Sequence, residues 1–337
     1  IDTKHLDSLE NKALNSDEPD VNVLLDKASN LILDSSLQGF LDNPITDIFV
    51  MVATPTSAHN GYDHSQVNSL CDDLIAFGRQ PEQRHLYIGC TTMPGYCSEL
   101  AEKLKPYNWT GSYNPEFIAQ GTVIYNQRHP DQVLIGEANV EVGDRLQSIY
   151  SKLVQNDPTY CRMDVLSAEI TKLATNCFLT TKISFANSIG DLAKSVGADP
   201  DKILNAVGSD SRIGDKYLNY GFGFGGPCFP RDNRALGQFA QSQGQQLYIS
   251  AATDEVNKQH LNFQIQDIIK SKEEDTPIEF QTITYKPSSV LLDESQQLAL
   301  AVALAKRGRT VVIYERPSVI KKVEAMYPGL FVLKGYT

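Results

Sequence analysis

The sequence predicts an α/β protein with a doubly wound sheet, and three observations support this fold class. Residues 46–57 and 85–94 are apolar runs that end in loops of small residues, as buried parallel strands do. The stretch 65–78 between them has a helical pattern, so strand, helix and strand alternate. Residues 167–196 contain no proline and a single glycine, which predicts one long helix after the sheet.

The composition excludes several classes of protein. A chain of 337 residues is long enough for about two domains with substantial cores. Thirty Lys and Arg against 41 Asp and Glu give a formal charge of −11, which argues against binding to nucleic acid or to an anionic membrane. The longest apolar stretch, residues 298–305, is too short for a membrane span, which needs about twenty residues.

The cysteines and the first residues indicate a compartment. Six cysteines are too few and too scattered for a disulfide scaffold, and no CxxC pair indicates structural zinc. The first ten residues have neither the basic nor the apolar region of a secretory signal. We therefore expect a cytoplasmic protein without a metal site and without a nucleic-acid or membrane partner.

Small hydroxyl residues stand where both predicted strands end. Thr54 and Thr56 follow the first strand, and Thr91 and Thr92 follow the second. Ligands of doubly wound sheets bind at the carboxyl ends of the strands, so these residues are candidates for ligand contacts. Threonines also cap turns, and the strand ends alone do not separate the two roles.

The long predicted helix carries a polar stripe beside its apolar face. Lys172 and Asn176 are four residues apart and therefore lie next to each other on one face. Glu169, Thr180 and Asn187 fall near the same stripe. A solvated helix face gives the same pattern, so the stripe alone does not establish a site.

A glycine-rich segment over residues 217–232, YLNYGFGFGGPCFPRD, precedes a helical stretch that starts at Asp232. Its glycines allow the backbone to approach a ligand closely. Cys228 lies just before the predicted helix start with Arg231 nearby, and both favour the thiolate over the thiol. We therefore expect Cys228 to be a nucleophile. Small buried apolar residues are expected at the other positions considered, Cys71, Cys90, Cys161 and Cys177.

A second α/β unit is predicted after a solvated connection at residues 273–277. Residues 279–286, 294–307 and 309–315 have the patterns of a strand, a helix and a strand. The sequence ends at Thr337, which leaves too few residues for a full-sized domain of this type.

Five separated motifs together resemble one protein family. They are VATPTS, CTTMPG, YNPEFIAQGTVI, SAEITKLATNCFL and SDSRIGDKYLNYGFGFGGPCFPRD, in that order. Their order and spacing resemble the UDP-glucose/GDP-mannose dehydrogenase family from about Asp2 to Glu315. Asn114 to Phe117 and Asn176 to Leu179 are most similar to the branch that oxidises UDP-glucose.

The resemblance implies three domains. Residues 1–155 would form an NAD-binding Rossmann-like domain, here without its glycine-rich first unit. Residues 156–260 would form a central helical domain that carries the catalytic cysteine and makes a homodimer through the long helix. Residues 261–337 would be part of a second Rossmann-like domain, which binds the UDP-sugar.

The implied reaction is a four-electron oxidation of UDP-glucose to UDP-glucuronate, in which NAD accepts two hydrides in succession. Cys228 would capture the intermediate aldehyde as a thiohemiacetal, which a second hydride transfer converts to a thioester that water cleaves. Lys172 and Asn176 match the pair that stabilises negative charge on the substrate oxygen. Glu116, Thr92 and Asp232 match the group that handles protons and the hydrolytic water.

The resemblance also assigns binding residues. NAD would contact Asp2, Thr54, Thr91, Gln120 and Arg231. The sugar nucleotide would contact Lys172 and Asn176 together with Phe117, Ile118, Ala119, Arg212, Tyr217, Leu218, Phe224, Gly225, Tyr285 and Lys286. Arg212 matches an arginine that reaches into a neighbouring subunit's site, and a guanidinium can bind phosphate or sugar oxygens through two hydrogen bonds.

The sequence also departs from the family pattern. The GxGxxG turn that holds the dinucleotide pyrophosphate is absent, and Asp2 aligns with the acidic residue that ends the family's second strand. Asp293 stands where relatives carry a cofactor-contacting arginine, and a carboxylate there would repel the pyrophosphate. Gln120 and Arg231 replace the usual glutamate and lysine.

These departures leave two hypotheses. The first is an active NAD-dependent dehydrogenase read from an incomplete chain, which acts on UDP-glucose or on another nucleotide sugar such as GDP-mannose. The second is a non-catalytic homologue that binds a sugar nucleotide or scaffolds a partner. The retained Cys228, Lys172, Asn176, Glu116 and Asp232 favour the first hypothesis, and the missing glycine-rich turn favours the second.

Overall fold

A computed structural model describes residues 3–14, 16, 18–42, 45–57, 61–118, 121–287 and 289–335. Asp2, Ala119 and Gln120, which the sequence assigned to ligand contacts, lie outside the described residues. The chain forms two compact units, which are considered one at a time. The first comprises Ile1–Ser57 and Tyr62–Lys172, and the second Ala58–Gly61 and Leu173–Thr337.

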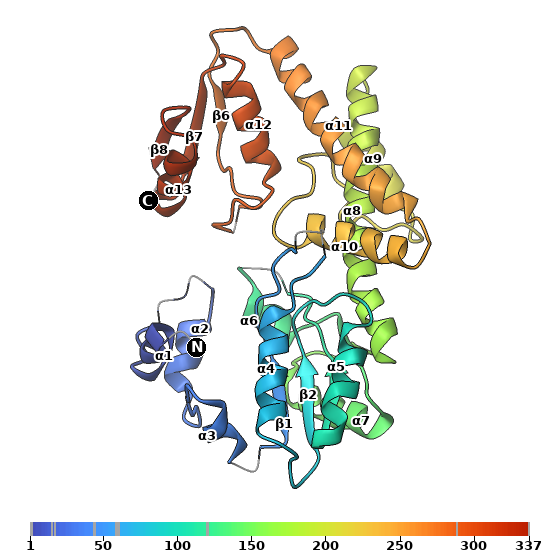
Figure 1. Ribbon diagram of the computed structural model, residues 1–337. Coiled ribbons are helices and arrows are strands. Elements are labelled where there is room, and N and C mark those ends of the chain that lie inside the picture. The colour runs from blue at the N-terminus through green and yellow to red at the C-terminus, as the bar shows by residue number, and fades with distance from the viewer. Residues whose placement is uncertain are drawn as a thin grey trace. The chain divides into compact units, whose positions relative to one another are not determined.

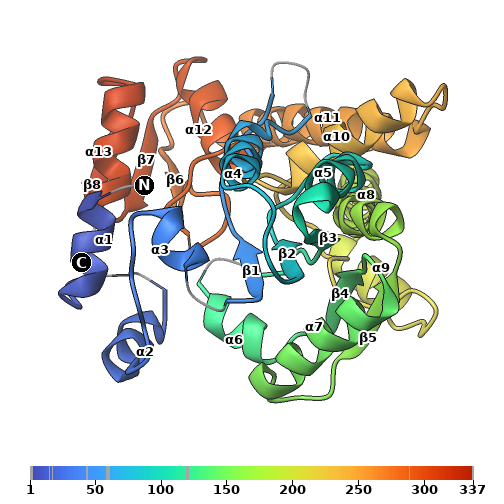
Figure 2. The ribbon, with the colours of Figure 1, turned by 60° about the horizontal axis from the view of Figure 1, so that its bottom comes forward.

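The first unit contains a five-stranded sheet whose strands follow in chain order from β1 to β5 (Figure 2). Its strands are β1 (Asp47–Val50), β2 (Arg84–Ile88), β3 (Trp109–Tyr113), β4 (Gln132–Gly136) and β5 (Thr159–Met163). The strands β1, β2 and β3 are parallel, as are β4 and β5. A single antiparallel pairing, Tyr113 with Gly136, joins β3 to β4. The predicted parallel sheet in an α/β fold is therefore confirmed.

Helices cover both faces of this sheet. Leu86 and Ile88 of β2 pack into one core with apolar residues of α4 (Ser65–Ala76) and α5 (Tyr96–Leu104). Tyr87 between them points to the opposite face and packs with Val142 and Leu146 of α7 (Val140–Leu153). This alternation of faces is the period-2 pattern of a strand buried on both sides. The other helices of the unit are α1 (Thr3–Glu10), α2 (Val21–Lys27), α3 (Leu37–Leu41), the 3₁₀ turn Lys105–Tyr107 and α6 (Val123–Arg128).

The predicted long helix is α8 (Val165–Ser195), whose 31 residues run from the first unit into the second. It is followed by α9 (Pro200–Gly208), α10 (Phe229–Ser242) and α11 (Tyr248–Ser271), and Figure 1 labels all four. Helix α10 begins three residues before the expected Asp232, because Pro230 suits the first turn of a helix, where its missing N–H is not needed. Cys228 is its N-cap, as the sequence predicted.

The second unit ends in a three-stranded parallel sheet ordered β6, β7, β8. Its elements are β6 (Ile278–Phe280), α12 (Gln296–Ala305), β7 (Val311–Glu315), α13 (Pro317–Met326) and β8 (Val332–Gly335). The strand expected over residues 279–286 ends at Phe280. Beyond it, the side-chain carboxylate of Glu315, the last residue of β7, accepts the Thr282 hydroxyl and the Ile283 N–H, so these groups do not bond to the backbone of β7. Ser295 caps α12 by accepting the Leu298 N–H.

Candidate active site

Two of the four threonines at the strand ends of the first unit, Thr54 and Thr92, are buried, whereas Thr91 is partly buried and Thr56 is exposed. Thr54, after β1, donates its hydroxyl to the Thr91 carbonyl at 2.9 Å, which joins the two strand ends. Thr92, after β2, is fully buried and donates its hydroxyl to Glu169 of α8 at 2.9 Å. These hydroxyls therefore fix the shape of the carboxyl edge of the sheet.

Glu169 is a central residue of this edge that the sequence analysis did not assign to the site. Its fully buried carboxylate also accepts the N–H groups of Gly95 at 2.7 Å and Cys97 at 2.9 Å, at the start of α5. Burial raises the pKa of Glu169, and these hydrogen bonds oppose the rise. The available signal was its position three residues before Lys172 on the predicted stripe.

Lys172 contacts the segment that contains Glu116. The buried ammonium donates to the Glu116 carbonyl at 2.7 Å and lies 4.3 Å from the centre of the Phe117 ring. The Glu116 carboxylate, which is half-buried, accepts a hydrogen bond from Gln127 at 2.9 Å. The first unit therefore brings together Lys172, Glu116 and Phe117, with Ile118 exposed beside them.

His64 supports the loop after β2 and was also missed by the sequence analysis. Its Nε2 accepts the Met93 N–H at 3.2 Å, and its ring stacks on Tyr96 at a centroid distance of 3.8 Å. Burial lowers the pKa of His64 to about 4. The neutral imidazole is thus the form that this loop requires.

The second unit brings together Asn176, Asp232 and Cys228. Asn176 of α8 donates its amide to the Asp232 carboxylate at 2.5 Å, and both side chains are buried. Asp232 lies in the first turn of α10, where the helix dipole stabilises a negative charge. Its N–H donates to the Cys228 carbonyl, so the carboxylate and the thiol are fixed on one helical turn. Arg231, which is half-buried, occupies the same turn.

Cys228 differs from the other cysteines in its exposure. Burial raises the pKa of Cys71 and Cys177 to about 12, and also raises the pKa of Cys90 and Cys97. Cys228 is the cysteine that is exposed, and it lies at a helix N-terminus. Cys161 corrects one expectation, because it is only partly buried in β5.

Side chains of two helices hold the backbone of the glycine-rich segment. Asn187 of α8 accepts the Gly221 N–H at 3.1 Å and donates to the Phe222 carbonyl at 3.3 Å. Asn257 of α11 accepts the Phe224 N–H and donates to the Phe224 carbonyl, both at 2.9 Å. These amides bond the backbone as a neighbouring strand would, which orders a segment without regular secondary structure.

Glycine is required where this segment meets the end of the second unit. A Cβ on Gly225 would lie 2.4 Å from the Glu294 carbonyl oxygen. Gly226 has a φ of 82°, and its Cβ would lie 2.5 Å from the ring of Tyr285. The Gly226 N–H donates to the Asp293 carbonyl at 2.9 Å. The structure therefore places the predicted residue Tyr285 against Gly226, the residue that follows the predicted Gly225.

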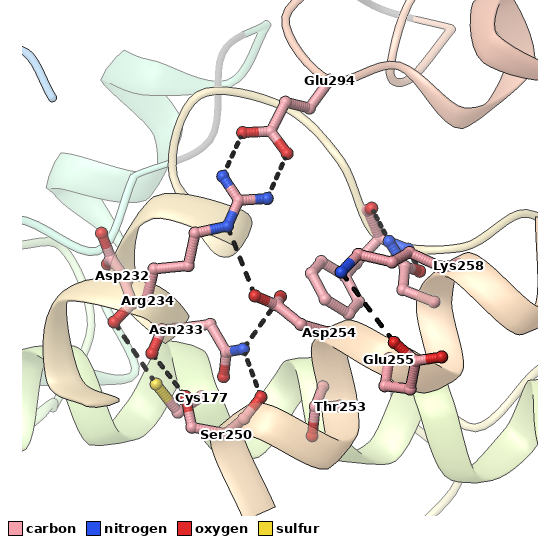
Figure 3. A network of polar contacts seen from close by, with 12 residues as sticks. Cys177, Asp232, Asn233, Arg234, Ser250, Thr253, Asp254, Glu255, Lys258 and Glu294 are labelled. Atoms are coloured by element: carbon pink, nitrogen blue, oxygen red, sulfur yellow. Dashed lines mark hydrogen bonds and ion pairs between the residues drawn. The ribbon is translucent and has the colours of Figure 1, made fainter. Parts of the chain in front are cut away.

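A charged network connects α10 to α11 and to Glu294, the residue that lies against Gly225 (Figure 3). Arg234 makes two parallel hydrogen bonds to the Glu294 carboxylate, at 2.7 and 2.6 Å, and its Nε donates to Asp254 of α11 at 3.3 Å. Asn233 donates to Asp254 at 3.1 Å and to the Ser250 carbonyl at 2.9 Å. Helix α10, whose N-cap is Cys228, is thereby tied to α11 and to Glu294.

The remaining predicted binding residues differ in exposure. Leu218 and Phe224 are buried, whereas Tyr217 is exposed and has a φ of 62°. The Lys286 ammonium lies 5.7 Å from the centre of the Tyr285 ring. Arg212 is exposed and pairs with Asp210 at 2.6 Å in its own chain.

Comparison with known proteins gives consistent results. Residues 1–154 match the NAD-binding domain of the UDP-glucose/GDP-mannose dehydrogenase family, and residues 166–259 match its central domain. UDP-glucose 6-dehydrogenase of Pseudomonas aeruginosa is 30% identical over 316 residues, which cover 90% of this chain and 68% of that protein. The Rickettsia bellii enzyme of the same name is 30% identical over 80% of this chain and 62% of that protein. A UDP-glucose dehydrogenase structure from Pyrobaculum islandicum superposes with a TM-score of 0.87 at 26% identity, over 99% of this chain and 79% of that chain.

Cys228 should react with iodoacetamide at least about tenfold faster than any other cysteine at pH 7, because it is exposed at a helix N-terminus and four of the others have raised pKa values. Peptide mapping by mass spectrometry after short exposure measures the order of labelling. The Cys228→Ser variant should lose the first label and keep the slow ones. Equal labelling of Cys161 would contradict the assignment.

Lowering the pH from 6.5 to 4 should destabilise the protein through His64. The unfolded chain protonates this residue near its ordinary pKa of 6.5 and the folded chain only near 4, so its contribution is present above pH 6.5 and lost as the pH falls to 4. Urea unfolding across this range should show a smaller loss in the His64→Gln variant, whose amide oxygen still accepts the Met93 N–H. His5→Gln, an exposed control on α1, should behave as the wild type. Identical pH profiles for all three proteins would refute this role.

Proposed function

The chain belongs to the UDP-glucose/GDP-mannose dehydrogenase family, and from this premise we propose that the protein oxidises UDP-glucose to UDP-glucuronate. Its cofactor is NAD, since the NAD-binding domain of the family spans residues 1–154. The observation that carries the proposal is the group in the second unit: an exposed Cys228 at a helix start, one turn from the buried Asp232 that Asn176 binds.

The residues at the carboxyl edge of the first sheet fit part of a dinucleotide. Ala53, Thr54 and Thr91 are small, Ala53 is exposed, and the bond between the two threonines holds the strand ends in place. A parallel sheet of this kind binds a dinucleotide at such an edge. When bound there, NAD supplies the acceptor for two hydrides, one from the alcohol carbon and one from the same carbon at the aldehyde level.

In the first oxidation, the protein's task is to remove a proton from the alcohol and to stabilise the negative oxygen. We assign the stabilisation to Lys172 and Asn176, which lie one turn apart on α8. Glu116 and Asp232 are the carboxylates that take up and return protons. Thr92 belongs to the same proposed group. Its hydroxyl bond to Glu169 holds the end of β2 against α8.

In the second oxidation, the Cys228 sulfur forms a bond to the aldehyde carbon, and the resulting thiohemiacetal loses a hydride to become a thioester. Water then attacks the acyl carbon, the carbon–sulfur bond breaks, and the thiol is restored. The sum is one alcohol, two NAD⁺ and one water converted to one carboxylate, two NADH and three protons. Each electron pair that leaves the sugar carbon is thereby accounted for.

We propose sugar-nucleotide contacts residue by residue, from the family motifs. The proposed contacts are Phe117, Ile118, Tyr217, Leu218, Phe224, Gly225, Tyr285 and Lys286. The contact between Gly225 and Glu294 and that between Gly226 and Tyr285 support a shared surface within the second unit. Arg212 is proposed to serve a neighbouring subunit, which its exposure permits.

An exposed apolar stripe on α8 supports the proposed homodimer. Phe178, Phe185 and Leu192 repeat every seven residues and are 64%, 48% and 60% exposed. A seven-residue repeat returns to nearly the same side of a helix and suits a helix–helix interface.

In the described part of the chain, no helix is long and apolar enough to cross a membrane. A cytoplasmic location stays part of the proposal.

The full natural chain should reduce about two NAD⁺ for each UDP-glucose consumed, because two hydrides leave the same carbon. NADH absorbance together with chromatography of the sugar nucleotide measures this ratio.

Lys172→Ala should lower turnover by about 10²-fold with the fold intact, because a preorganised charge stabilises the transition state. Lys202→Ala, at an exposed lysine, serves as the control and should leave turnover unchanged. Preferred oxidation of GDP-mannose would overturn the substrate assignment, and sugar-nucleotide binding without turnover would favour the non-catalytic homologue.

Introducing a charge into the α8 stripe should dissociate the dimer. In Phe185→Asp a carboxylate would be buried in the helix–helix interface, so light scattering coupled to gel filtration should show the monomer mass. Val140→Asp, on an exposed apolar residue of α7, serves as the control and should leave the dimer intact. A monomeric wild type, or an unchanged mass in Phe185→Asp, would contradict this interface.

A further inference from the structure

A buried histidine binds the first glycine of the glycine-rich segment. His260 of α11 is 2% exposed, and both of its ring nitrogens have partners. Its Nδ1 lies 2.8 and 2.9 Å from the two oxygens of the Asp191 carboxylate on α8, and its Nε2 lies 2.6 Å from the Gly221 carbonyl oxygen. His260 therefore connects both long helices of the second unit to Gly221.

These contacts determine how many protons the group carries. A carbonyl oxygen only accepts, so the Nε2 that faces Gly221 must carry a proton. One more proton lies between Nδ1 and Asp191, since two acceptors 2.8 Å apart would otherwise repel each other. The pair thus holds one proton more than a neutral histidine beside an ionised aspartate.

The Asp191 carboxylate of this pair has a further donor, the Tyr220 hydroxyl, which stabilises its ionised form. Tyr220 donates its hydroxyl to Asp191 at 2.9 Å, and burial together with that bond raises the pKa of Tyr220, so it stays a donor. Lys194 of α8 lies 5.6 Å from the Tyr220 ring and pairs with Asp267 of α11 at 2.9 Å. These are the charged and titratable groups that flank His260 among the described residues of α8, α11 and the segment itself.

Gly221 is the residue through which this group acts on the candidate site. Gln264 also donates to the Gly221 carbonyl, at 3.1 Å, and Asn187 accepts its N–H. From Gly221 the segment passes Phe224 and Gly225 and reaches Cys228 seven residues later. A shift of Gly221 would therefore move the backbone that leads to the proposed nucleophile.

We propose that His260 is a positioning residue whose extra proton holds Gly221, and with it the glycine-rich segment, in the form that binds substrate. Without that proton, the remaining ring hydrogen stays on Nδ1, where the ionised Asp191 carboxylate accepts it, and Nε2 faces the Gly221 carbonyl with no hydrogen between them. The Gly221 carbonyl then keeps only the longer bond from Gln264. The effect on substrate rests on the proposed function, but the ordering of the segment does not.

Hydrogen–deuterium exchange of the peptide that covers residues 218–225 tests the ordering directly. The protection factor of this peptide should be at least about tenfold higher in the wild type than in His260→Leu, which has no ring N–H for the Gly221 carbonyl. His260→Gln keeps an amide donor and should recover part of this protection. His129→Leu, in the other unit, should retain the wild-type protection. Equal protection in the wild type and in His260→Leu would overturn the proposal.

Two further readouts separate this role from a purely structural one. The ¹⁵N shifts of the His260 ring in the wild-type protein should show both nitrogens protonated, or one proton shared with Asp191, at pH 6; an unprotonated Nε2 would overturn the proposal even if the variants fail to fold. In the active enzyme, the KM for the sugar nucleotide should rise in His260→Leu and return toward the wild-type value in His260→Gln. A protein that shows the difference in protection but no turnover would contradict the proposed function and leave the positioning role standing.

Discussion

One helix supplies the fixed frame of the candidate site. Along its 31 residues, α8 carries Glu169, which binds the loop after β2, then Lys172 and Asn176, and finally Asn187 and Asp191, which hold the glycine-rich segment directly or through His260. Because a helix fixes the spacing of its residues at about 1.5 Å per residue, Glu169 and Lys172 keep their separation within the first unit, and Asn176, Asn187 and Asp191 keep theirs within the second. Each of the two units is then organised by its own hydrogen bonds to α8.

The second constraint is the backbone of the glycine-rich segment. Glycines let it approach Glu294 and Tyr285 closely, but they leave its N–H and carbonyl groups without a strand or helix to bond. Asn187, Asn257 and His260 provide those bonds from the flanking helices. The same bonds explain why polar side chains are buried on α8, where Glu169 and Asn187 are 0% and 1% exposed. The sequence left open that the polar stripe of α8 is a solvated helix face, and the burial of Glu169 and Asn187 excludes this interpretation for both residues.

Sequence reasoning located what is encoded locally. The apolar runs, the uninterrupted stretch of α8, and Cys228 before Pro230 each depend on neighbours within a few residues, and the structure confirms a strand in each run and the long helix. The first run corrects one expectation, because β1 is an edge strand of four residues in which only Val50 is buried. Glu169, His64 and His260 were missed because their partners are 29 to 77 residues away in the chain. The early end of β6 at Phe280 has the same cause, since the competing acceptor is Glu315 on another strand. The family resemblance predicts which residues react, but it did not indicate Glu169, His64 and His260, which hold the surrounding backbone.

The central claim is that Cys228 forms a covalent bond to the substrate carbon, and the Cys228→Ser variant tests it most directly. Oxygen at position 228 is the poorer nucleophile and leaving group, so the second half of the reaction should stall. After incubation of the full natural chain with UDP-glucose and NAD⁺, intact-mass and peptide measurements should find the sugar nucleotide retained at position 228. Turnover at the wild-type rate by this variant, or an adduct on a different residue, would contradict the account.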